Sequence, residues 1–223
     1  MRRNPCRVDG QAGTLPSVTN LWLALLRIAF GLLVVAALAF MIYTLVDGGT
    51  FNALNFFTFF TVMSNILAAA VLIEGGRREL SGAEPVPDMW RGAAVVYMTV
   101  TYIVFAVLLR DLQEELQTNV PWVDSVLHRV MPIAVMADWL IDPPRTAIAF
   151  RRALAWLGFP LAWTAFTLIR GEIDGRYPYP FLDPANGGYG VVALYSVAIL
   201  ALFLAVIWAT ASVGTAIRAR RRD

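Results

Sequence analysis

The sequence predicts an all-α polytopic membrane protein, a single bundle of six transmembrane helices with both termini in the cytoplasm. Its 223 residues are 58% hydrophobic and have a mean hydropathy of +0.62, which is too apolar for a soluble domain of ordinary composition. Several apolar runs reach the roughly 18 residues that are typical of a transmembrane helix. The arginines are distributed unevenly between alternate loops, which orients these helices.

Six apolar runs define the expected helices. The polar residues 1–19 are expected to form a flexible cytoplasmic tail, residues 20–217 the transmembrane domain and residues 218–223 a basic cytoplasmic tail. The helices are expected at 20–46, from 51 or 55 to 73, and at 90–109, 123–141, 153–169 and 190–217. The first run is much longer than the apolar core of a cleaved signal peptide, and Arg27 near its start is expected to extend to the membrane interface.

Each expected helix is bounded by residues that favour turns. Asp47-Gly48-Gly49 ends the first helix, and the charged loop 74–89 with its two prolines ends the second. An acidic loop at 110–121 follows the third helix, and Pro143-Pro144 end the fourth. A loop rich in glycine, proline and tyrosine, 170–189, separates the last two helices.

All 18 basic residues are arginines, and their distribution orients the bundle. Thirteen lie in the two tails and the loops expected on one side, and three lie in the other loops. The thirteen are Arg2, Arg3, Arg7, Arg77, Arg78, Arg91, Arg145, Arg151, Arg152, Arg218, Arg220, Arg221 and Arg222; the three are Arg110, Arg170 and Arg176. Because arginine-rich loops stay in the cytoplasm, this alternation predicts a multi-pass protein of the cell membrane.

The composition excludes several classes of function. A nucleic-acid partner is not expected, because the chain has no basic face or aromatic–basic repeat. Cys6 is the only cysteine and His128 the only histidine, so a zinc site of nitrogen and sulfur ligands is not expected, and nothing implies a cofactor. The G-x-S-x-G elbow, the P-loop and the H-E-x-x-H motif are also missing.

The fourth expected helix holds the residues of greatest interest. It contains Asp124, His128, Arg129 and Asp138, and such residues at membrane depth are costly and usually face a polar interior. At about 100° per residue the acids and the histidine share a face, although Pro132 should kink the helix. Asp124 could orient the His128 ring, whereas Asp138 is too distant and should pair with Arg129 or with another helix. The alternative role for His128 is a structural hydrogen bond.

The second expected helix carries a polar stripe of Thr58, Thr61, Ser64 and Asn65. Such residues often only pack transmembrane helices together or bond their own backbone. At about 1.5 Å per residue, however, Thr61 and His128 lie at a similar depth. A threonine hydroxyl needs an adjacent base to become a nucleophile, so the two residues together suggest covalent catalysis. Ser64, Asn65 or backbone amides could then donate to an oxyanion.

Three residues near the expected outer side are further candidates for a pocket. Arg110 is either an interfacial charge or a pocket residue, and Asp183 either forms a turn or supports the site. Tyr179 belongs to two consecutive Tyr-Pro pairs, which are rigid and aromatic and suit a lid or an interfacial belt.

Three motifs resemble a known family. Residues 60–65 read FTVMSN, residues 128–132 read HRVMP and are followed by DWL at 138–140, and residues 179–183 read YPFLD. Together they are similar to the bacterial six-helix membrane relatives of the androgen-induced and androgen-dependent TFPI-regulating proteins. The resemblance covers most of the chain from the first helix to the sixth.

The resemblance implies a multi-pass membrane hydrolase with a threonine nucleophile and a histidine partner. The animal members of that family hydrolyse fatty acid esters of hydroxy fatty acids. By motif position the catalytic histidine falls on His128, and the threonine falls on Thr61 or, with a three-residue shift, on Thr58. The expected partners are the lipid bilayer and a lipid-like ester substrate. The rival hypothesis is a non-enzymatic carrier or sensor that binds a lipid or a proton at the same polar face.

Overall fold

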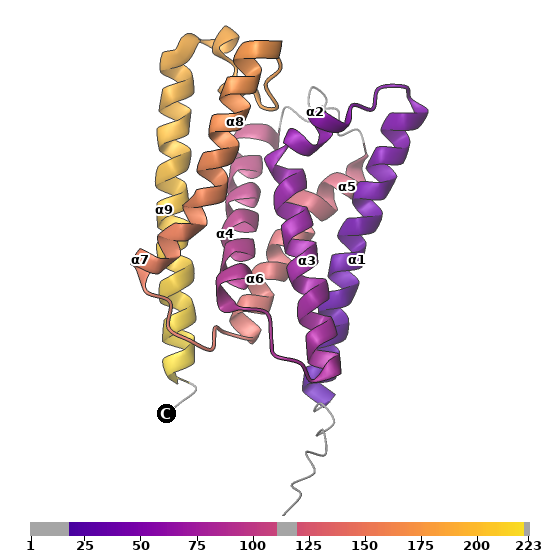
Figure 1. Cartoon of the computed structure of the whole chain (residues 1–223), viewed down its shortest axis with the longest axis vertical. Helices are drawn as coiled ribbons and strands as arrows, with labels where there is room; N and C mark the ends of the chain where they lie inside the picture. Colours follow the sequence, from indigo (N-terminus) through magenta and orange to yellow (C-terminus); the bar gives the residue numbers. More distant parts are fainter. Residues whose placement is uncertain (1–17, 111–119, 221–223) are drawn as a thin grey trace, which may run out of the picture.

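The computed structural model describes residues 18–110 and 120–220, and this part of the chain is helical without β-strands (Figure 1). The elements are α1 (Val18–Asp47), α2 (Ala53–Thr58), α3 (Phe60–Ser81), α4 (Asp88–Val104), η1 (Phe105–Leu109), α5 (Pro121–Ser125), η3 (Val126–Val130), α6 (Met131–Ile141), α7 (Phe150–Ala153), η4 (Leu154–Leu157), α8 (Gly158–Asp174), η5 (Pro180–Leu182), η6 (Pro184–Asn186) and α9 (Gly188–Arg220). The elements η1 and η3 are π-helical turns. The expected tail up to residue 17, the loop residues 111–119 and the last three residues lie outside the described part.

Four helical stretches of the described chain are long and apolar enough to cross a membrane. They are Leu21–Asp47, Asp88–Leu109, Phe150–Asp174 and Gly188–Arg220. The stretches Phe150–Asp174 and Gly188–Arg220 are longer than the fifth and sixth predicted helices, which were expected at 153–169 and 190–217. The helix α3 and the continuous stretch α5–η3–α6 run lengthwise beside them but carry more polar and charged residues (Figure 1).

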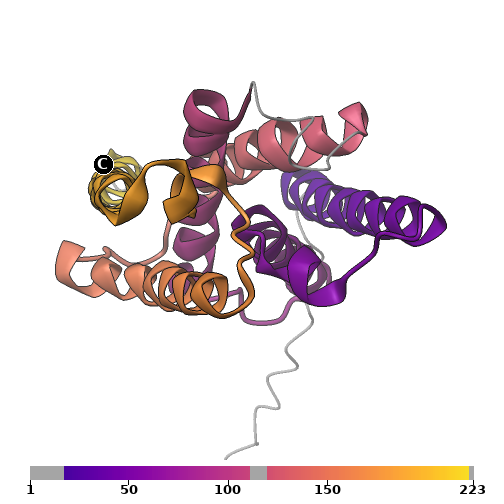
Figure 2. The ribbon, with the colours of Figure 1, turned by 90° about the horizontal axis from the view of Figure 1, so that it is seen from above.

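The helix α4 lies at the centre of the bundle. It packs against α3, α6 and α9, and the view from above places α8 and α9 on one side of it and α3, α5 and α1 on the other (Figure 2). Accordingly, 61% of its most apolar part is buried, against 22–33% for the other three candidate spans. We call the end of the bundle where α2 lies the α2 end. The opposite end, where α3 and α9 finish and toward which α7 lies, is called the α7 end (Figure 1).

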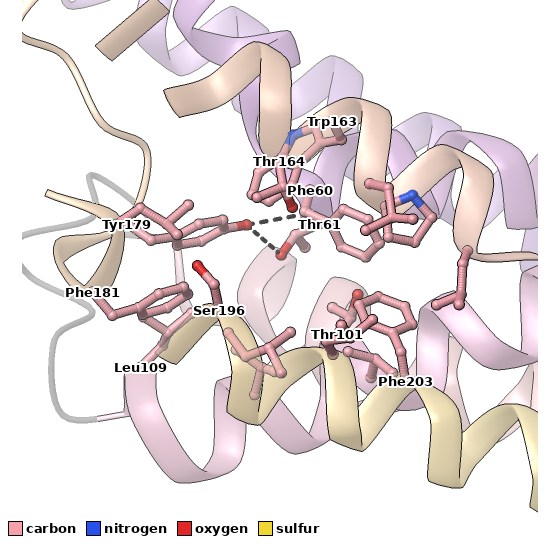
Figure 3. Close-up of a pocket in the computed structure, with 18 residues that line it drawn as sticks. Phe60, Thr61, Thr101, Leu109, Trp163, Thr164, Tyr179, Phe181, Ser196 and Phe203 are labelled. Carbon is pink, nitrogen blue, oxygen red and sulfur yellow. Dashed lines mark hydrogen bonds between the residues drawn. The ribbon is translucent and has the colours of Figure 1, made fainter. Parts of the chain in front are cut away.

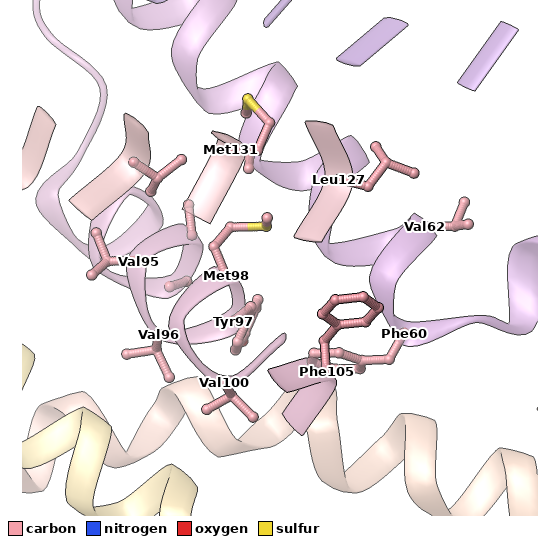
Figure 4. Packing of buried hydrophobic residues seen from close by; sticks show 14 of the residues in the cluster. Phe60, Val62, Val95, Val96, Tyr97, Met98, Val100, Phe105, Leu127 and Met131 are labelled. Atoms are coloured by element: carbon pink, nitrogen blue, oxygen red, sulfur yellow. The ribbon is translucent and has the colours of Figure 1, made fainter. Parts of the chain in front are cut away.

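Small residues let the helices approach closely, as is common between transmembrane helices. A Cβ on Gly76 of α3 would lie 2.5 Å from the Ala24 carbonyl oxygen of α1, so glycine is required where these helices meet. A Cβ on Gly92 of α4 would collide with the indole of Trp156 in the same way. The rest of the core is aliphatic and aromatic, with α4 side chains meeting Phe105, Leu127 and others (Figure 4).

The second predicted helix is broken into two. Phe59 adopts an extended conformation (φ −65°, ψ 125°) between α2 and α3, so the polar stripe is not one continuous helical face. The fourth predicted helix continues through Pro132 as α5–η3–α6, and a π-helical turn lies directly before the proline at which a kink was expected. In both places the sequence predicted a helix and the local backbone departs from regular α geometry.

Two arginines and two aspartates form a buried ion network at the α7 end. Arg27 of α1 donates from Nε to Asp138 at 2.5 Å and from one terminal nitrogen to Asp142 at 2.6 Å. Arg91 of α4 donates to the second Asp138 oxygen at 3.0 Å and to the Asp142 carbonyl at 2.6 Å. The network therefore joins α1 and α4 to the end of α6.

One prediction about these charges is corrected, and another is decided between its two alternatives. Arg27 is 6% exposed and does not extend to the interface, because Asp138 and Asp142 neutralise it inside the bundle. Asp138 pairs with other helices, the second of its two predicted alternatives, and not with Arg129. The Arg129 guanidinium instead lies 5.9 Å from the centre of the Phe105 ring.

Asp138→Ala should destabilise the protein strongly, because two buried guanidinium groups would lose a carboxylate. Removing one partner of a buried ion pair typically costs about 3–5 kcal/mol. We expect a lower midpoint of thermal denaturation in detergent micelles. The control is Arg77→Ala, which removes an exposed pair with Glu74 and should leave the midpoint unchanged. A wild-type midpoint for Asp138→Ala would mean that Asp142 alone satisfies both arginines.

Candidate functional site

The π-helical turn η3 positions the only histidine. At the end of this turn the Met131 N–H donates to the Val126 carbonyl, five residues back. The next amide in such a ladder would serve the Leu127 carbonyl, but Pro132 has no N–H. Asn65 of α3 fills that role, since its Nδ2 donates to the Leu127 oxygen at 3.1 Å. The irregular turn thus exposes a carbonyl that ties α3 to the histidine-bearing helix.

His128 is buried and connected on both ring nitrogens. Its Nε2 lies 3.2 Å from the Thr61 Oγ1, and its Nδ1 lies 2.9 Å from the Asp124 Oδ1 and 3.2 Å from the Asp124 carbonyl oxygen. Phe105, from the π-helical turn η1, stacks on the ring with centroids 4.0 Å apart. The predicted meeting of His128 with a hydroxyl of the polar stripe is therefore present. Phe105 carried no sequence signal, since it is one apolar residue in an apolar helix.

The contacts of His128 define its tautomer. The Asp124 carbonyl oxygen only accepts hydrogen bonds, so the Nδ1 that contacts it carries the hydrogen. In the neutral ring Nε2 is then the acceptor, and the Thr61 hydroxyl donates to it. Asp124, His128 and Thr61 thus place an acid, an imidazole and a hydroxyl in successive contact. This is the geometry that can activate a hydroxyl as a nucleophile.

Thr61 lies in the first turn of α3, immediately after the break at Phe59. Helix N-termini leave amides without a partner inside the helix, and here the Thr61 N–H donates to the Tyr179 hydroxyl at 3.3 Å. The same hydroxyl lies 3.4 Å from the Thr61 Oγ1. Asp124, Tyr179, His128 and Thr61 are only 4–8% exposed, so the whole group is buried.

Ser64 and Asn65 lie beside Thr61 but their hydrogens are already used. Both amide hydrogens of Asn65 are engaged, by the Thr61 carbonyl at 2.9 Å and by the Leu127 carbonyl. The Ser64 hydroxyl donates to the Thr61 carbonyl at 3.1 Å and lies 3.2 Å from the Thr101 hydroxyl. In this geometry they position Thr61, in contrast to the predicted role as oxyanion donors.

Thr58 belongs to a different cluster. Its Oγ1 accepts a hydrogen bond from Arg170 at 2.7 Å and donates to the Leu54 carbonyl, and its own carbonyl accepts from the Trp163 indole. Arg170 also bonds to the Asn55 side chain. Because the chain turns at Phe59, Thr58 contacts α8, whereas Thr61 contacts His128.

Two cavities meet at Thr61 and Tyr179. The larger, of about 190 Å³, lies between α4, α8 and α9 and is lined mainly by apolar side chains, with Phe60, Phe181 and Phe203 among them (Figure 3). The smaller, of about 40 Å³, reaches His128. Leu109, Thr61 and Tyr179 border both, and Figure 3 shows the Tyr179 hydroxyl pointing toward Thr61. The threonine therefore has an imidazole on one side and an apolar cavity on the other.

The other predicted site residues lie apart from this group. Asp183 caps the short helix η6 by accepting from the Ala185 N–H at 2.8 Å, and it lines a polar cavity of about 380 Å³ at the α2 end. Arg110 follows η1 with its side chain exposed, and Asp138 lies in the ion network at the α7 end. Within the described residues, no three His, Cys, Asp or Glu side chains gather as metal ligands.

The chain matches no known family model, and no curated protein or solved structure is significantly similar to it.

Asn65→Ala should destabilise the protein by about 1–3 kcal/mol, because it leaves the buried Leu127 carbonyl without a donor. In a Pro132→Ala background the cost should be smaller, since the new amide at position 132 can take that carbonyl. Thermal denaturation of the wild type, the two single variants and the double variant in micelles gives the coupling between the two positions. Equal costs in both backgrounds would contradict the role assigned to Asn65.

Proposed function

We propose that this chain is an integral membrane ester hydrolase in which Thr61 is the nucleophile and His128 the general base. The observation that carries the proposal is the buried chain from Asp124 through His128 to the Thr61 hydroxyl, with 2.9 Å and 3.2 Å between successive polar atoms. The resemblance of residues 60–65, 128–132 and 179–183 to motifs of the membrane threonine hydrolases also supports it. Thr58 is the less suitable nucleophile, because its hydroxyl contacts a guanidinium and no base.

The residues support acyl transfer in two halves. In the first half the Thr61 Oγ bonds to the ester carbonyl carbon, His128 takes the hydroxyl proton, and the leaving alcohol receives that proton as the carbon–oxygen bond breaks. In the second half a water gives its proton to His128 and its hydroxide to the acyl carbon, and Thr61 recovers its hydrogen as the acid departs. Asp124 holds the ring and stabilises the imidazolium formed in each half.

The larger cavity supports a lipid-like substrate. Its lining is mainly apolar, and it begins at the Thr61 hydroxyl, where a carbonyl would have to lie. Leu161 of α8 and Leu200 of α9 line it and are also 52% and 36% exposed, so its wall is continuous with the apolar outer face of the bundle. An acyl chain in the surrounding bilayer would meet that face directly.

The proposed topology has six spans in the cell membrane, with both termini in the cytoplasm. The helix α3 and the stretch α5–η3–α6 would join the four apolar stretches as spans, since both run the length of the bundle in Figure 1. The last turns of α3 and α9 and the segment from α6 into α7 lie toward the α7 end (Figure 1), and they carry the arginines at 77, 78, 145, 151, 152, 218 and 220. The positive-inside rule then assigns the α7 end to the cytoplasm and the α2 end to the exterior.

Thr61→Ala should abolish covalent labelling by a fluorophosphonate. In that labelling reaction the enzyme's hydroxyl attacks the phosphorus of the reagent and fluoride leaves. Thr58→Ala is the matched control and should keep most of the labelling, because it removes a hydroxyl three residues away that contacts Arg170 and not His128. His128→Ala should also abolish labelling, because the hydroxyl then has no base. Labelling is measured on purified membranes at equal protein levels.

The same experiment separates the hydrolase from its rival. A carrier or sensor that binds a lipid or a proton at this polar face would bind the reagent without forming a bond to Thr61. Thr61→Ser, which keeps the nucleophile, should retain labelling. Full labelling of a well-folded Thr61→Ala variant would exclude Thr61 as the nucleophile.

Single cysteines in a Cys6→Ala background test the topology. Thr50→Cys and Ala185→Cys at the α2 end should react with a membrane-impermeant thiol reagent in intact cells. Ala83→Cys at the α7 end should react only after the cells are permeabilised. All three positions are exposed, so the reagent can reach them once they are on its side of the membrane. Protection of both α2-end cysteines in intact cells would invert the proposed orientation.

A further inference from the structure

We propose that Tyr179 is a third catalytic residue, whose hydroxyl acts with the Thr61 backbone N–H to stabilise the oxyanion formed on the ester carbonyl. The inference rests on the proposed ester hydrolysis and assigns the group that the mechanism still lacks. Acyl transfer through a tetrahedral intermediate needs hydrogen-bond donors aimed at the developing negative charge.

The other polar side chains beside Thr61 have no hydrogen left to donate to the oxyanion. Asn65 spends both amide hydrogens on the Thr61 and Leu127 carbonyls, and Ser64 donates to the Thr61 carbonyl. His128 is the base, so its Nε2 carries no hydrogen when the reaction begins. The Thr61 N–H and the Tyr179 hydroxyl are the donors that lie at the reacting oxygen.

The hydrogen of the Tyr179 hydroxyl is already directed at the nucleophile. The single hydroxyl hydrogen of Thr61 goes to His128, so in the 3.4 Å contact between the two oxygens Tyr179 is the donor. In the tetrahedral intermediate the oxyanion is only two bonds from the Thr61 Oγ. It therefore falls beside both the phenol and the Thr61 amide, which are themselves 3.3 Å apart.

The phenol is held in place before the reaction. Its ring is stacked on Phe181 with centroids 5.2 Å apart, lies in a T-shaped arrangement with Phe59 at 5.8 Å, and is tilted against Trp163 at 5.9 Å. The surroundings are buried and mainly apolar, where a fixed dipole stabilises charge more strongly than in water. A donor fixed in this way needs no reorganisation when the charge appears.

Tyr179 keeps its proton throughout the step. As the Thr61 Oγ bonds to the carbonyl carbon, the carbonyl π electrons move to oxygen and the Thr61 proton moves to His128. The Tyr179 O–H and the Thr61 N–H then hydrogen-bond to the oxyanion. When the carbonyl re-forms, the bond to the alcohol oxygen breaks and that oxygen takes the proton from His128.

Tyr179→Phe in the full-length protein tests this role, with fluorophosphonate labelling measured over a range of reagent concentrations. The maximal labelling rate should fall about 100-fold, as for loss of one oxyanion donor in other enzymes. The half-saturating concentration should stay unchanged, because the shape of the site is kept. The thermal midpoint should fall, because the buried Thr61 N–H loses its acceptor, so labelling is measured at a temperature where both proteins are folded. Tyr177→Phe, two residues away in the same loop, is the control and should label at the wild-type rate.

A second variant keeps the test valid if the phenylalanine variant misfolds. A 3-fluorotyrosine at position 179 keeps the shape but makes the phenol more acidic, so loss of labelling at alkaline pH should shift to lower pH. Wild-type labelling rates for Tyr179→Phe, a change only in the half-saturating concentration, or an unshifted pH profile would overturn the proposal while the hydrolase stands. Absence of labelling in the wild-type protein would overturn both.

Discussion

The hydrogen bond from Asn65 to the Leu127 carbonyl is the constraint on which the geometry of the site depends. It joins the helix that carries Thr61 to the helix that carries His128, and the same amide group also holds the Thr61 carbonyl. The acceptor is available only because Pro132 cannot complete the π-helical turn that precedes it. A proline on one helix therefore fixes the distance between two side chains on different helices.

The bundle divides its polar interactions between its two ends. At the α7 end the ion network between Arg27, Arg91, Asp138 and Asp142 joins α1, α4 and α6, and its charges balance. Toward the α2 end the helices are joined by hydroxyls, one imidazole, aromatic rings and the Arg170 guanidinium. The helix α9 packs on η4, which precedes α8, and on η5–η6, which follow it. The apolar cavity lies between α4, α8 and α9. The ion network holds the helices together at the α7 end, while the cavity leaves part of the bundle unfilled toward the α2 end.

Much of the helical structure could be predicted from the sequence, because long apolar runs report directly on helices. The pairing of Thr61 with His128 was also accessible, since helical rise places both at one depth. The break at Phe59 was not, because phenylalanine is compatible with helix and nothing local marks the turn. Arg27 was misjudged for a similar reason: its partners lie 111 and 115 residues away in sequence, and only the packing of α1 against α6 brings them together.

The irregular backbone is what lets one small site hold several polar groups inside an apolar bundle. A regular helix through Phe59 would use the Thr61 amide internally, whereas the break directs it to the Tyr179 hydroxyl. The π-helical turns η1 and η3 place Phe105 against the His128 ring at the same level. Thr61 consequently contacts His128 on one side and lines the larger cavity on the other. In the proposed hydrolase a substrate carbonyl in that cavity would approach the hydroxyl without displacing the histidine, which is the spatial requirement of general-base catalysis.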